Sequence, residues 1–221
     1  MERTVSARQL LDMTYDTIDL SGIWGNCIGN MSRYGVVFIW GNSGNGKTSA
    51  TLSLCKELAR FGKVLYIPLE EGHSLSLQNG VRRAGLVECG SRFQILRTAT
   101  LEELDERLSK KRSAEFIVID SFQYMNISYR NYIAFKTRHL DKLLIFVSHA
   151  DGKQPAGRAA KSVMYDADLK IWVEGHTAFS KGRFIGITGE AVIWQEGAEK
   201  YWGLRPEDEF KIRSHEKNET E

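Results

Sequence analysis

The sequence predicts an α/β fold with a mostly parallel central sheet, because short apolar runs alternate with helical patterns up to Ala150. The runs are continuously apolar, which is typical of strands buried on both faces. Strands that alternate with helices are joined by right-handed crossovers and therefore lie parallel. After Ala150 short apolar runs follow one another closely, which predicts C-terminal antiparallel strands.

The expected elements can be placed in order along the chain. The first clear strand is Gly35 to Gly41, an apolar run that ends in glycine, and a helix is expected from Lys47 to Arg60. Further strands are expected at 63–68, 93–96, 116–120 and 143–147, and further helices at 75–84, 101–110 and 130–140. Acidic side chains early in 101–110 and basic ones late suit the helix dipole, which supports that helix.

The C-terminal part of the chain is predicted to be less regular. Residues 151–165 hold Gly, Pro and Ala with few large apolar side chains, and they are expected to form a loop. Short strands are expected at 169–173, 183–188 and 191–195. Residues 205–221 are mostly charged and lack an apolar stripe, which predicts a solvated or disordered tail.

One domain is expected to hold most of the chain, since 221 residues correspond to one domain with additions. The first twenty residues show a weak helical pattern around Leu10, Leu11 and Met13. The predicted organisation is therefore an N-terminal helical extension over 1–20, a domain over 21–204 and a charged tail over 205–221.

Composition excludes several classes of protein. Hydrophobic residues make 42% and charged residues 26% of the chain, as in an ordinary globular protein. No apolar run approaches the length of a membrane span, and no secretory signal is readable at the start. The net charge of +2 neither indicates nor excludes a nucleic-acid partner. Cys27, Cys55 and Cys89 are widely spaced, which predicts reduced structural thiols in a cytoplasmic protein.

Residues 41–48 form a phosphate-binding motif between the first clear strand and the helix that follows. They read GNSGNGKT, which fits G-x-x-x-x-G-K-[ST] at every defined position. The glycines let backbone N–H groups wrap a phosphate chain, Lys47 places a cation on the β and γ oxygens, and the Thr48 hydroxyl suits Mg²⁺. The predicted nucleotide-binding residues are Gly41, Asn42, Ser43, Gly44, Asn45, Gly46, Lys47, Thr48 and Ser49.

Two strand ends supply the acids that such a site needs. The apolar run FIVID ends in Asp120, and a parallel strand presents that carboxylate at the ligand-binding edge of the sheet. Asp120 is therefore the predicted metal ligand beside Thr48. The second strand is followed by Glu70 and Glu71, one of which could orient or deprotonate the attacking water. Glu70 is preferred and Glu71 is the fallback, and a solvated acidic turn is the alternative interpretation.

Four stretches in this order resemble the RecA-like ATPase core, and most closely the bacterial RadA/Sms and DnaB helicase branch. They are GVVFIWGNSGNGKT, LEEG, FIVIDSFQ, and KGRFIG at residues 181–186. The resemblance covers roughly residues 20–195 and implies a three-layer RecA-like P-loop NTPase that hydrolyses ATP with Mg²⁺. The zinc finger, protease-like domain and helicase N-terminal domain of those relatives have no counterpart in the sequence, so their whole functions are not transferred.

The resemblance also implies roles for residues outside the phosphate loop. The first glutamate of LEEG, Glu70, would be the catalytic base. Lys181 and Arg183 would be fingers that reach the γ-phosphate of a neighbouring subunit, although Gly182 stands where the family has Asn. His149, at a strand end, would sense the γ-phosphate. The alternatives are a solvated hairpin edge for the two cations and a purely structural histidine.

A DNA partner is predicted from the segment that follows His149. By the resemblance, residues 152–165 take the place of the family's DNA-binding loop, and the segment contains basic residues and no acid. Its cations are Lys153, Arg158 and Lys161. Aromatic and basic side chains after Asp120, which could stack on bases in the same channel, are Tyr124, Tyr129 and Arg130. Charges that serve solubility and aromatic rings that belong to the core are the alternatives.

The sequence therefore predicts a Mg²⁺-dependent ATPase of the RecA-like class that acts on DNA, with single-stranded DNA favoured, as a homo-oligomer without a membrane partner. The first alternative is a nucleotide-dependent loader or switch module that recruits a helicase or recombinase. The second is a small-molecule phosphotransferase, for which no acceptor pocket or lid is evident. The absence of an N-K-x-D motif argues against a GTPase.

Overall fold

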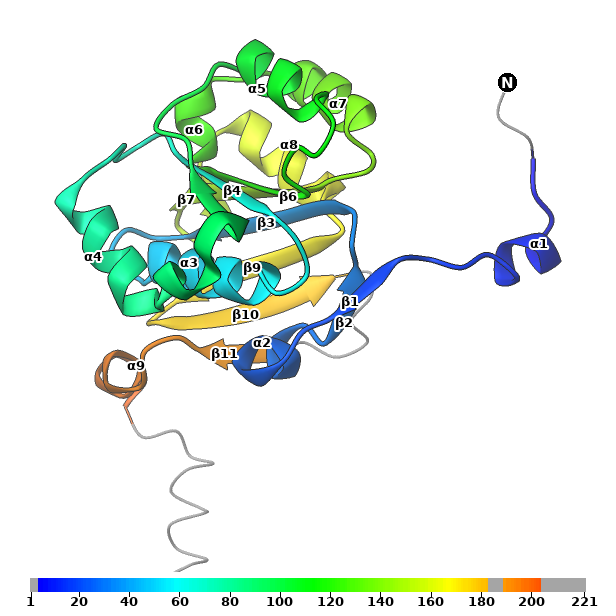
Figure 1. Cartoon of the computed structure of the whole chain (residues 1–221). Coiled ribbons are helices and arrows are strands. Elements are labelled where there is room, and N and C mark those ends of the chain that lie inside the picture. The colour runs from blue at the N-terminus through cyan, green and yellow to red at the C-terminus, as the bar shows by residue number, and fades with distance from the viewer. Residues whose placement is uncertain (1–3, 183–188, 204–221) are drawn as a thin grey trace, which may run out of the picture.

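A single large sheet crosses the molecule and carries helices on both faces (Figure 1). The computed structural model describes residues 4–182 and 189–203. Within these residues the sheet runs in the order β11-β10-β9-β3-β7-β6-β4-β5, and β8 pairs with β7. Its strands are β3 (Gly35–Gly41), β4 (Val64–Pro68), β5 (Phe93–Ile95), β6 (Phe116–Asp120), β7 (Leu143–Asp151), β8 (Gln154–Pro155), β9 (Leu169–Glu174), β10 (Thr177–Gly182) and β11 (Gly189–Val192).

The strands divide into a parallel and an antiparallel part. Neighbouring strands from β9 to β5 are parallel, whereas β10 and β11 continue the sheet antiparallel beyond β9. The carboxyl ends of β3, β4, β6 and β7 therefore meet at one edge of the sheet, where an open α/β fold binds its ligand. The predicted fold, with its mostly parallel sheet and C-terminal antiparallel strands, is confirmed.

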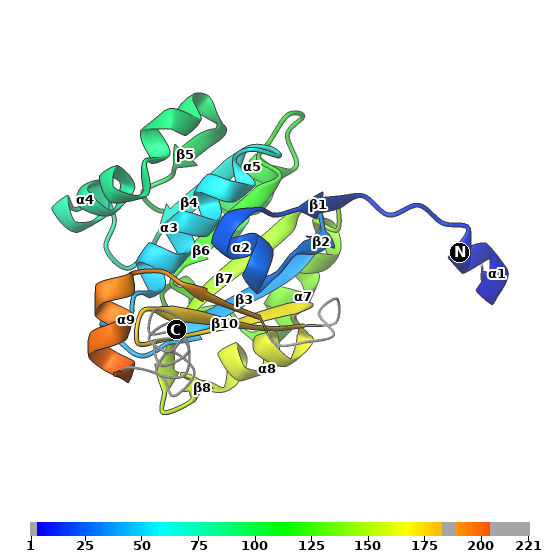
Figure 2. The same cartoon turned by 90° about the horizontal axis from the view of Figure 1, so that it is seen from below.

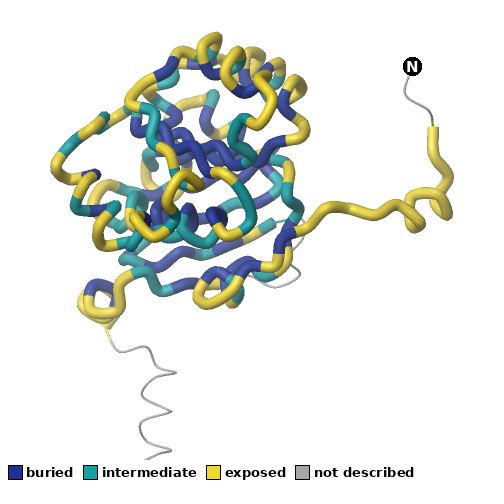
Figure 3. Tube along the Cα trace, viewed as in Figure 1, coloured by how far each residue is buried: buried dark blue, intermediate teal, exposed yellow. Residues whose placement is uncertain are grey.

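Alternation along the strands builds one core on each face of the sheet. Val37 and Ile39 of β3 pack with α2, α3 and α4, whereas Val36 and Phe38 of the same strand pack with α5 to α8. Figure 3 shows the resulting buried layer between exposed helix surfaces. The helices are α2 (Gly22–Cys27), α3 (Lys47–Leu58), α4 (Leu75–Ala84), α5 (Leu101–Leu108), α6 (Phe122–Met125), α7 (Tyr129–Arg138) and α8 (Arg158–Asp166).

The expected loop at 151–165 is wrong for most of its length. Strand β7 continues to Asp151 and turns back into β8, and helix α8 follows from Arg158. The helix forms because Ala160, Val163 and Met164 recur at helical spacing and bury one face in the core beside α7. The sequence analysis took this amphipathic helix for a loop because its buried face contains alanine and few large apolar residues.

The C-terminal strands also differ from the prediction in detail. The expected strand at 169–173 is β9, which lies parallel to β3 and antiparallel to β10. Strand β10 was not predicted, and the expected strand at 183–188 lies outside the described residues, as does the tail at 205–221. The expected strand at 191–195 is β11 at 189–192, and an unpredicted helix α9 (Gln195–Trp202) follows.

The N-terminal residues form an arm and a small antiparallel strand pair whose strands are separated by α2. The arm carries the short helix α1 (Ala7–Leu11), which is exposed and stands away from the domain (Figure 1). Strands β1 (Thr17–Asp19) and β2 (Asn30–Ser32) pair with each other and place Ile18 in the core. No helix among the described residues is long and apolar enough to cross a bilayer.

Candidate nucleotide-binding site

The P-loop joins the end of β3 to the start of α3 and is shaped by two left-handed glycines. Gly44 and Gly46 have φ values of 77° and 92°, which residues with a side chain rarely adopt. Between them, the Asn45 side chain accepts a 2.7 Å hydrogen bond from the Gly175 amide, and its carbonyl accepts one of 3.1 Å from the His176 amide. The loop is therefore fastened directly to the β9–β10 turn.

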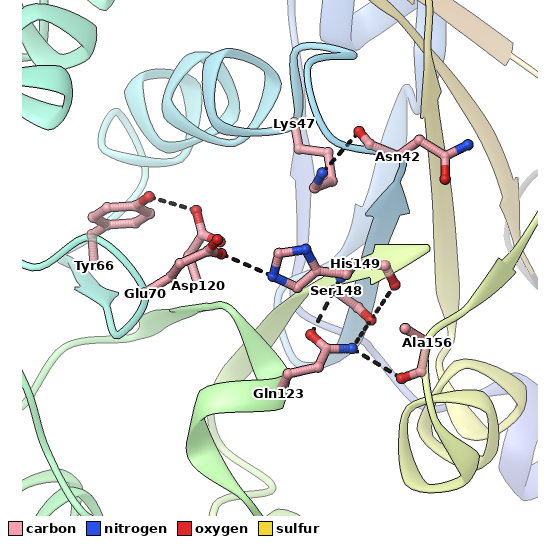
Figure 4. A network of polar contacts seen from close by, with 9 residues as sticks. All are labelled: Asn42, Lys47, Tyr66, Glu70, Asp120, Gln123, Ser148, His149 and Ala156. Carbon is pink, nitrogen blue, oxygen red and sulfur yellow. Dashed lines mark hydrogen bonds and ion pairs between the residues drawn. The ribbon is translucent and has the colours of Figure 1, made fainter. Parts of the chain in front are cut away.

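Lys47 begins α3 and points back across the loop. Its Nζ donates to the Asn42 carbonyl at 3.0 Å (Figure 4). Burial lowers the pKa of this ammonium, and the carboxylates of Asp120 and Glu70 oppose that shift. Phosphate oxygens are charged acceptors, so they would hold the ammonium more strongly than the neutral carbonyl does.

A cavity of about 870 Å³ opens over the P-loop. Its walls come from the start of α3, the segments that follow β4 and β11, the ends of β6 and β7, helix α4 and the turn after β9. The lining residues are Ser43, Gly44, Gly46, Lys47, Thr48, Ser49, Ser53, Lys56, Glu70, Glu71, Gly80, Arg83, Ala84, Asp120, His149, His176, Ile193 and Trp194. The structure thus brings most of the predicted loop together with both predicted acids and His149.

Asp120 is a buried carboxyl with one strong hydrogen-bond donor. The Tyr66 hydroxyl donates to its Oδ2 at 2.7 Å across the neighbouring strands β4 and β6. Burial raises the pKa of Asp120 to about 6; the Tyr66 hydrogen bond lowers it, and the nearby charges of Glu70 and Glu71 raise it. Tyr66 is a site residue that the sequence analysis missed, because its strand was judged by its apolar pattern alone.

Glu70 and His149 meet in the lining of the cavity. Nε2 of His149 lies 2.9 Å from Oε2 of Glu70, and both side chains are partly exposed (Figure 4). Glu71 also lines the cavity, but its Oε2 accepts at 3.0 Å from the hydroxyl of Ser74, which is the N-cap of α4. The two acids therefore have different local partners.

Gln123 links the His149 strand to the chain behind it. Its Oε1 accepts from the His149 amide at 3.2 Å, while its Nε2 donates to the Ser148 hydroxyl at 2.7 Å and to the Ala156 carbonyl at 3.0 Å (Figure 4). One side chain thus joins β7 to the segment between β8 and α8. Gln123 was overlooked although it ends the stretch FIVIDSFQ, and its chain position beside the acid is the signal that could have found it.

The residues present fit a magnesium ion that is shared with phosphate. Within the described residues no cluster of three or more His, Cys, Asp or Glu could hold a metal by itself. Thr48 and Asp120 line the same cavity and offer a hydroxyl and a carboxylate oxygen. Mg²⁺ is commonly held by one or two protein oxygens together with substrate phosphates and water, and this donor set suits it.

The predicted DNA-contacting cations lie outside the cavity lining. Lys153 is in the β7–β8 turn, and its carbonyl accepts from the Trp40 indole at 3.1 Å beside the P-loop strand. Arg158 and Lys161 are exposed on the first turns of α8. The side chains expected to stack on bases, Tyr124, Tyr129 and Arg130, are exposed on α6 and α7.

Of the two predicted fingers, Lys181 lies away from the cavity of its own chain. Lys181 is exposed near the end of β10, where it pairs with Lys170. Strand β10 begins beside the P-loop at Thr177 and runs away from it, so Lys181 lies at the far end. Arg183 lies outside the described residues.

Comparisons with known proteins bear on the fold. No protein-family model matches the chain, and no curated protein matches its sequence. Among solved structures, the chain is similar to the flagellar accessory protein FlaH from Methanocaldococcus jannaschii, with a TM-score of 0.55 and 14% identity. The similarity covers 77% of this chain and 88% of that chain. The fold is RecA-like.

A RecA-like fold with a P-loop supports a nucleotide-binding module. At this level of identity the likeness to FlaH shows the fold alone, and one fold can serve many functions. The choice of reaction and partner therefore depends on the residues of the cavity.

Proposed function

We propose that the chain is a Mg²⁺-dependent ATPase of the RecA-like class that acts on DNA as an oligomer. The observation that carries the proposal is the convergence of Lys47, Thr48, Asp120 and Glu70 in one cavity. A cation, a hydroxyl, a buried carboxylate and a second acid are the groups that phosphoryl transfer to water requires. The order of the four sequence motifs supports a relationship to the RadA and DnaB branch.

Each residue has a distinct part in the proposed reaction. Lys47 leaves the Asn42 carbonyl and binds the β and γ oxygens of ATP. Thr48 and Asp120 would hold Mg²⁺, and the ion would supply positive charge that neutralises the charge developing on the transferred phosphoryl group. Glu70 accepts a proton from the water that attacks the γ-phosphorus, and the bond to the leaving ADP oxygen breaks.

His149 positions the proposed base. Its Nε2 contact with Glu70 fixes the carboxylate in the cavity lining, beside the place that an attacking water would take. Because Gln123 binds the His149 backbone, a displacement of His149 by the γ-phosphate would reach the β7–β8 hairpin. That hairpin carries Lys153 and leads into the basic start of α8, so this route is the proposed link between nucleotide and DNA.

The direct test is phosphate release from MgATP, measured with and without single-stranded DNA. The Lys47→Ala variant is expected to lose turnover, since no other cation replaces the ammonium on the β and γ oxygens. Lys110→Ala, an exposed lysine beyond α5, is the matched control and should retain wild-type turnover. Wild-type turnover in the Lys47 variant would refute the proposed site.

A nucleotide-dependent switch module is the second candidate. It is favoured by the hydrogen bonds of Gln123, which connect His149 in the cavity lining to the segment between the exposed β7–β8 hairpin and the basic start of α8. A switch needs differential binding in two states rather than fast hydrolysis. Turnover that stays negligible with DNA and rises only with a partner protein would support the switch over the motor.

A further inference from the structure

The cavity over the P-loop has two chemically different ends. The sheet order places β7, β6 and β4 on one side of β3, and β9, β10 and β11 on the other. The acids Glu70 and Asp120 come from the first side. His176, Ile193 and Trp194 come from the second side and line the same cavity. A ligand that fills the cavity therefore meets carboxylates at one end and aromatic rings at the other.

The two rings at the second end form a pair. The ring centroids of His176 and Trp194 lie 4.9 Å apart, with the planes at 75°. The amide of Ile193, next to Trp194, donates to the His176 carbonyl at 2.8 Å. The Trp194 residue remains 52% exposed. A large indole in the lining of the cavity is thus partly uncovered, and its neighbour on the chain is hydrogen-bonded to the His176 turn.

His176 is placed beside the P-loop by an unusual turn. Gly175 and His176 have φ values of 50° and 57°, which gives the two-residue turn between β9 and β10 its tight shape. A side chain in the left-handed region is uncommon. The two hydrogen bonds from this turn to Asn45 hold it against the loop. A Cβ at Gly46 would lie 3.0 Å from the His176 ring, so the ring packs directly on the loop.

Helix α9 packs against both rings. A Cβ at Gly197 would lie 2.3 Å from Trp194 and 2.6 Å from His176, so glycine lets the helix backbone approach both rings closely. Figure 2 shows α9 on the same side of the domain as α3, whose first turn lines the cavity. His176 therefore packs on the P-loop, and both rings pack on α9.

From this arrangement we infer that the His176–Trp194 pair is the subsite for the base of the nucleotide, and that it favours a purine. The inference rests on the proposed ATP site. The triphosphate occupies the P-loop, with its γ end toward Glu70 and Asp120, so the base extends toward the rings. Stacking against aromatic side chains stabilises any base, and a purine gains more because its face is larger.

The test compares binding of a non-hydrolysable ATP analogue with binding of inorganic tripolyphosphate, both with Mg²⁺, by calorimetry on the full chain. Trp194→Ala is expected to weaken the analogue by about ten-fold or more, the range of base stacking. Tripolyphosphate affinity should stay unchanged, because that probe has no base. Trp194→Phe should restore most of the affinity for the ATP analogue. The equivalent CTP analogue should bind the wild type more weakly than the ATP analogue does, and Trp194→Ala should reduce its affinity by a smaller factor.

Tyr165→Ala removes an exposed aromatic ring from α8, outside the cavity lining, and is the matched control. Its affinities should equal those of the wild type. The inference is overturned if Trp194→Ala leaves the analogue unchanged, or if it weakens tripolyphosphate equally. In both cases Lys47→Ala should still abolish binding of both probes, so the proposed function survives. A wild-type chain that binds neither probe overturns the function and the base subsite together.

Discussion

The Tyr66 hydroxyl donates a 2.7 Å hydrogen bond to Oδ2 of Asp120, between adjacent parallel strands. Asp120 is buried, and without this donor its charged form would lose its direct hydrogen-bonded support among the described residues. A buried acid with a pKa raised to about 6 depends on such support to remain ionised near neutral pH. Tyr66 is therefore a positioning residue for the proposed magnesium ligand.

Replacement of Tyr66 by Phe tests this relationship. The variant keeps the ring and removes the donor, so the pKa of Asp120 should rise further above its usual range. We expect Mg²⁺-dependent nucleotide binding at neutral pH to weaken several-fold and unfolding free energy to fall by about 1.5–3 kcal/mol. Titration of Mg²⁺ at fixed nucleotide and urea unfolding are the measurements. An unchanged Mg²⁺ dependence would show that the hydroxyl is only structural.

Substitution of each of the two acids that follow β4 should affect turnover differently. Glu70→Gln removes the proposed proton acceptor beside His149 and should lower turnover by about 10²-fold or more with nucleotide binding nearly intact. Glu71→Gln alters the contact with Ser74 and should leave most of the turnover. Single-turnover hydrolysis, with binding measured in parallel, distinguishes them. The reverse result would identify Glu71 as the base.

Local sequence patterns were sufficient to predict the P-loop and the strand that carries Asp120. Residues 41–48 need only their own spacing, and the apolar run at 116–120 predicts both a buried strand and the acid at its end. Each of those signals lies within a few consecutive residues, so it can be recognised in a single sequence. Helix α8 carries the same kind of signal, because Ala160, Val163 and Met164 recur at helical spacing. The signal was missed because alanine is small and the segment therefore contains few large apolar residues.

Other site residues depend on the sheet order, which no local pattern contains. Tyr66 meets Asp120 because β4 and β6 are neighbours, and His176 meets Asn45 because β9 lies beside β3. The strand β9 was expected as an antiparallel addition, and its parallel pairing with β3 is what moves the next turn against the P-loop. Such contacts follow from long-range pairing and therefore required the structure.

Gln123 offers a test of the proposed link between the nucleotide site and DNA. Gln123→Leu removes the bonds to the His149 amide and the Ala156 carbonyl while keeping a side chain of similar size. ATP binding should change less than two-fold, because Gln123 is absent from the cavity lining. The increment of turnover caused by single-stranded DNA should disappear. A variant with full DNA stimulation would exclude this side chain as the link.

The basic segment after His149 should contribute non-specific DNA affinity. Joint replacement of Lys153, Arg158 and Lys161 by Gln should weaken single-stranded DNA binding similarly for different sequences. Each lost phosphate contact flattens the dependence of log affinity on log salt by about 0.7, so the slope should fall by up to about 2. Fluorescence anisotropy at several salt concentrations measures both effects. The matched control neutralises exposed cations near the end of α5, namely Arg107, Lys110 and Lys111; equal losses in both variants would contradict a local binding segment.

The position of Lys181 leads to a prediction about assembly. The side chain is exposed at the end of β10 remote from the P-loop, so it cannot line the cavity of its own chain. If it acts on phosphate, it acts on that of a neighbouring subunit, and a cation supplied in this way stabilises charge on the transferred phosphoryl group. Specific activity of the wild type should then rise with protein concentration as interfaces form.

Mixing two inactive variants tests this directly. Lys181→Ala retains an intact P-loop, Lys47→Ala retains an intact finger, and each alone should be inactive. In a random equal mixture roughly a quarter of head-to-tail interfaces pair the intact P-loop with the intact finger, so activity should return to that fraction of the wild type. Arg183→Ala, whose residue lies outside the described part of the chain, should behave like Lys181→Ala in a parallel mixture. Mixtures that remain inactive where the wild type is oligomeric and active would mean that residues 181–183 do not act across an interface, and Lys181 would be a solvated strand end.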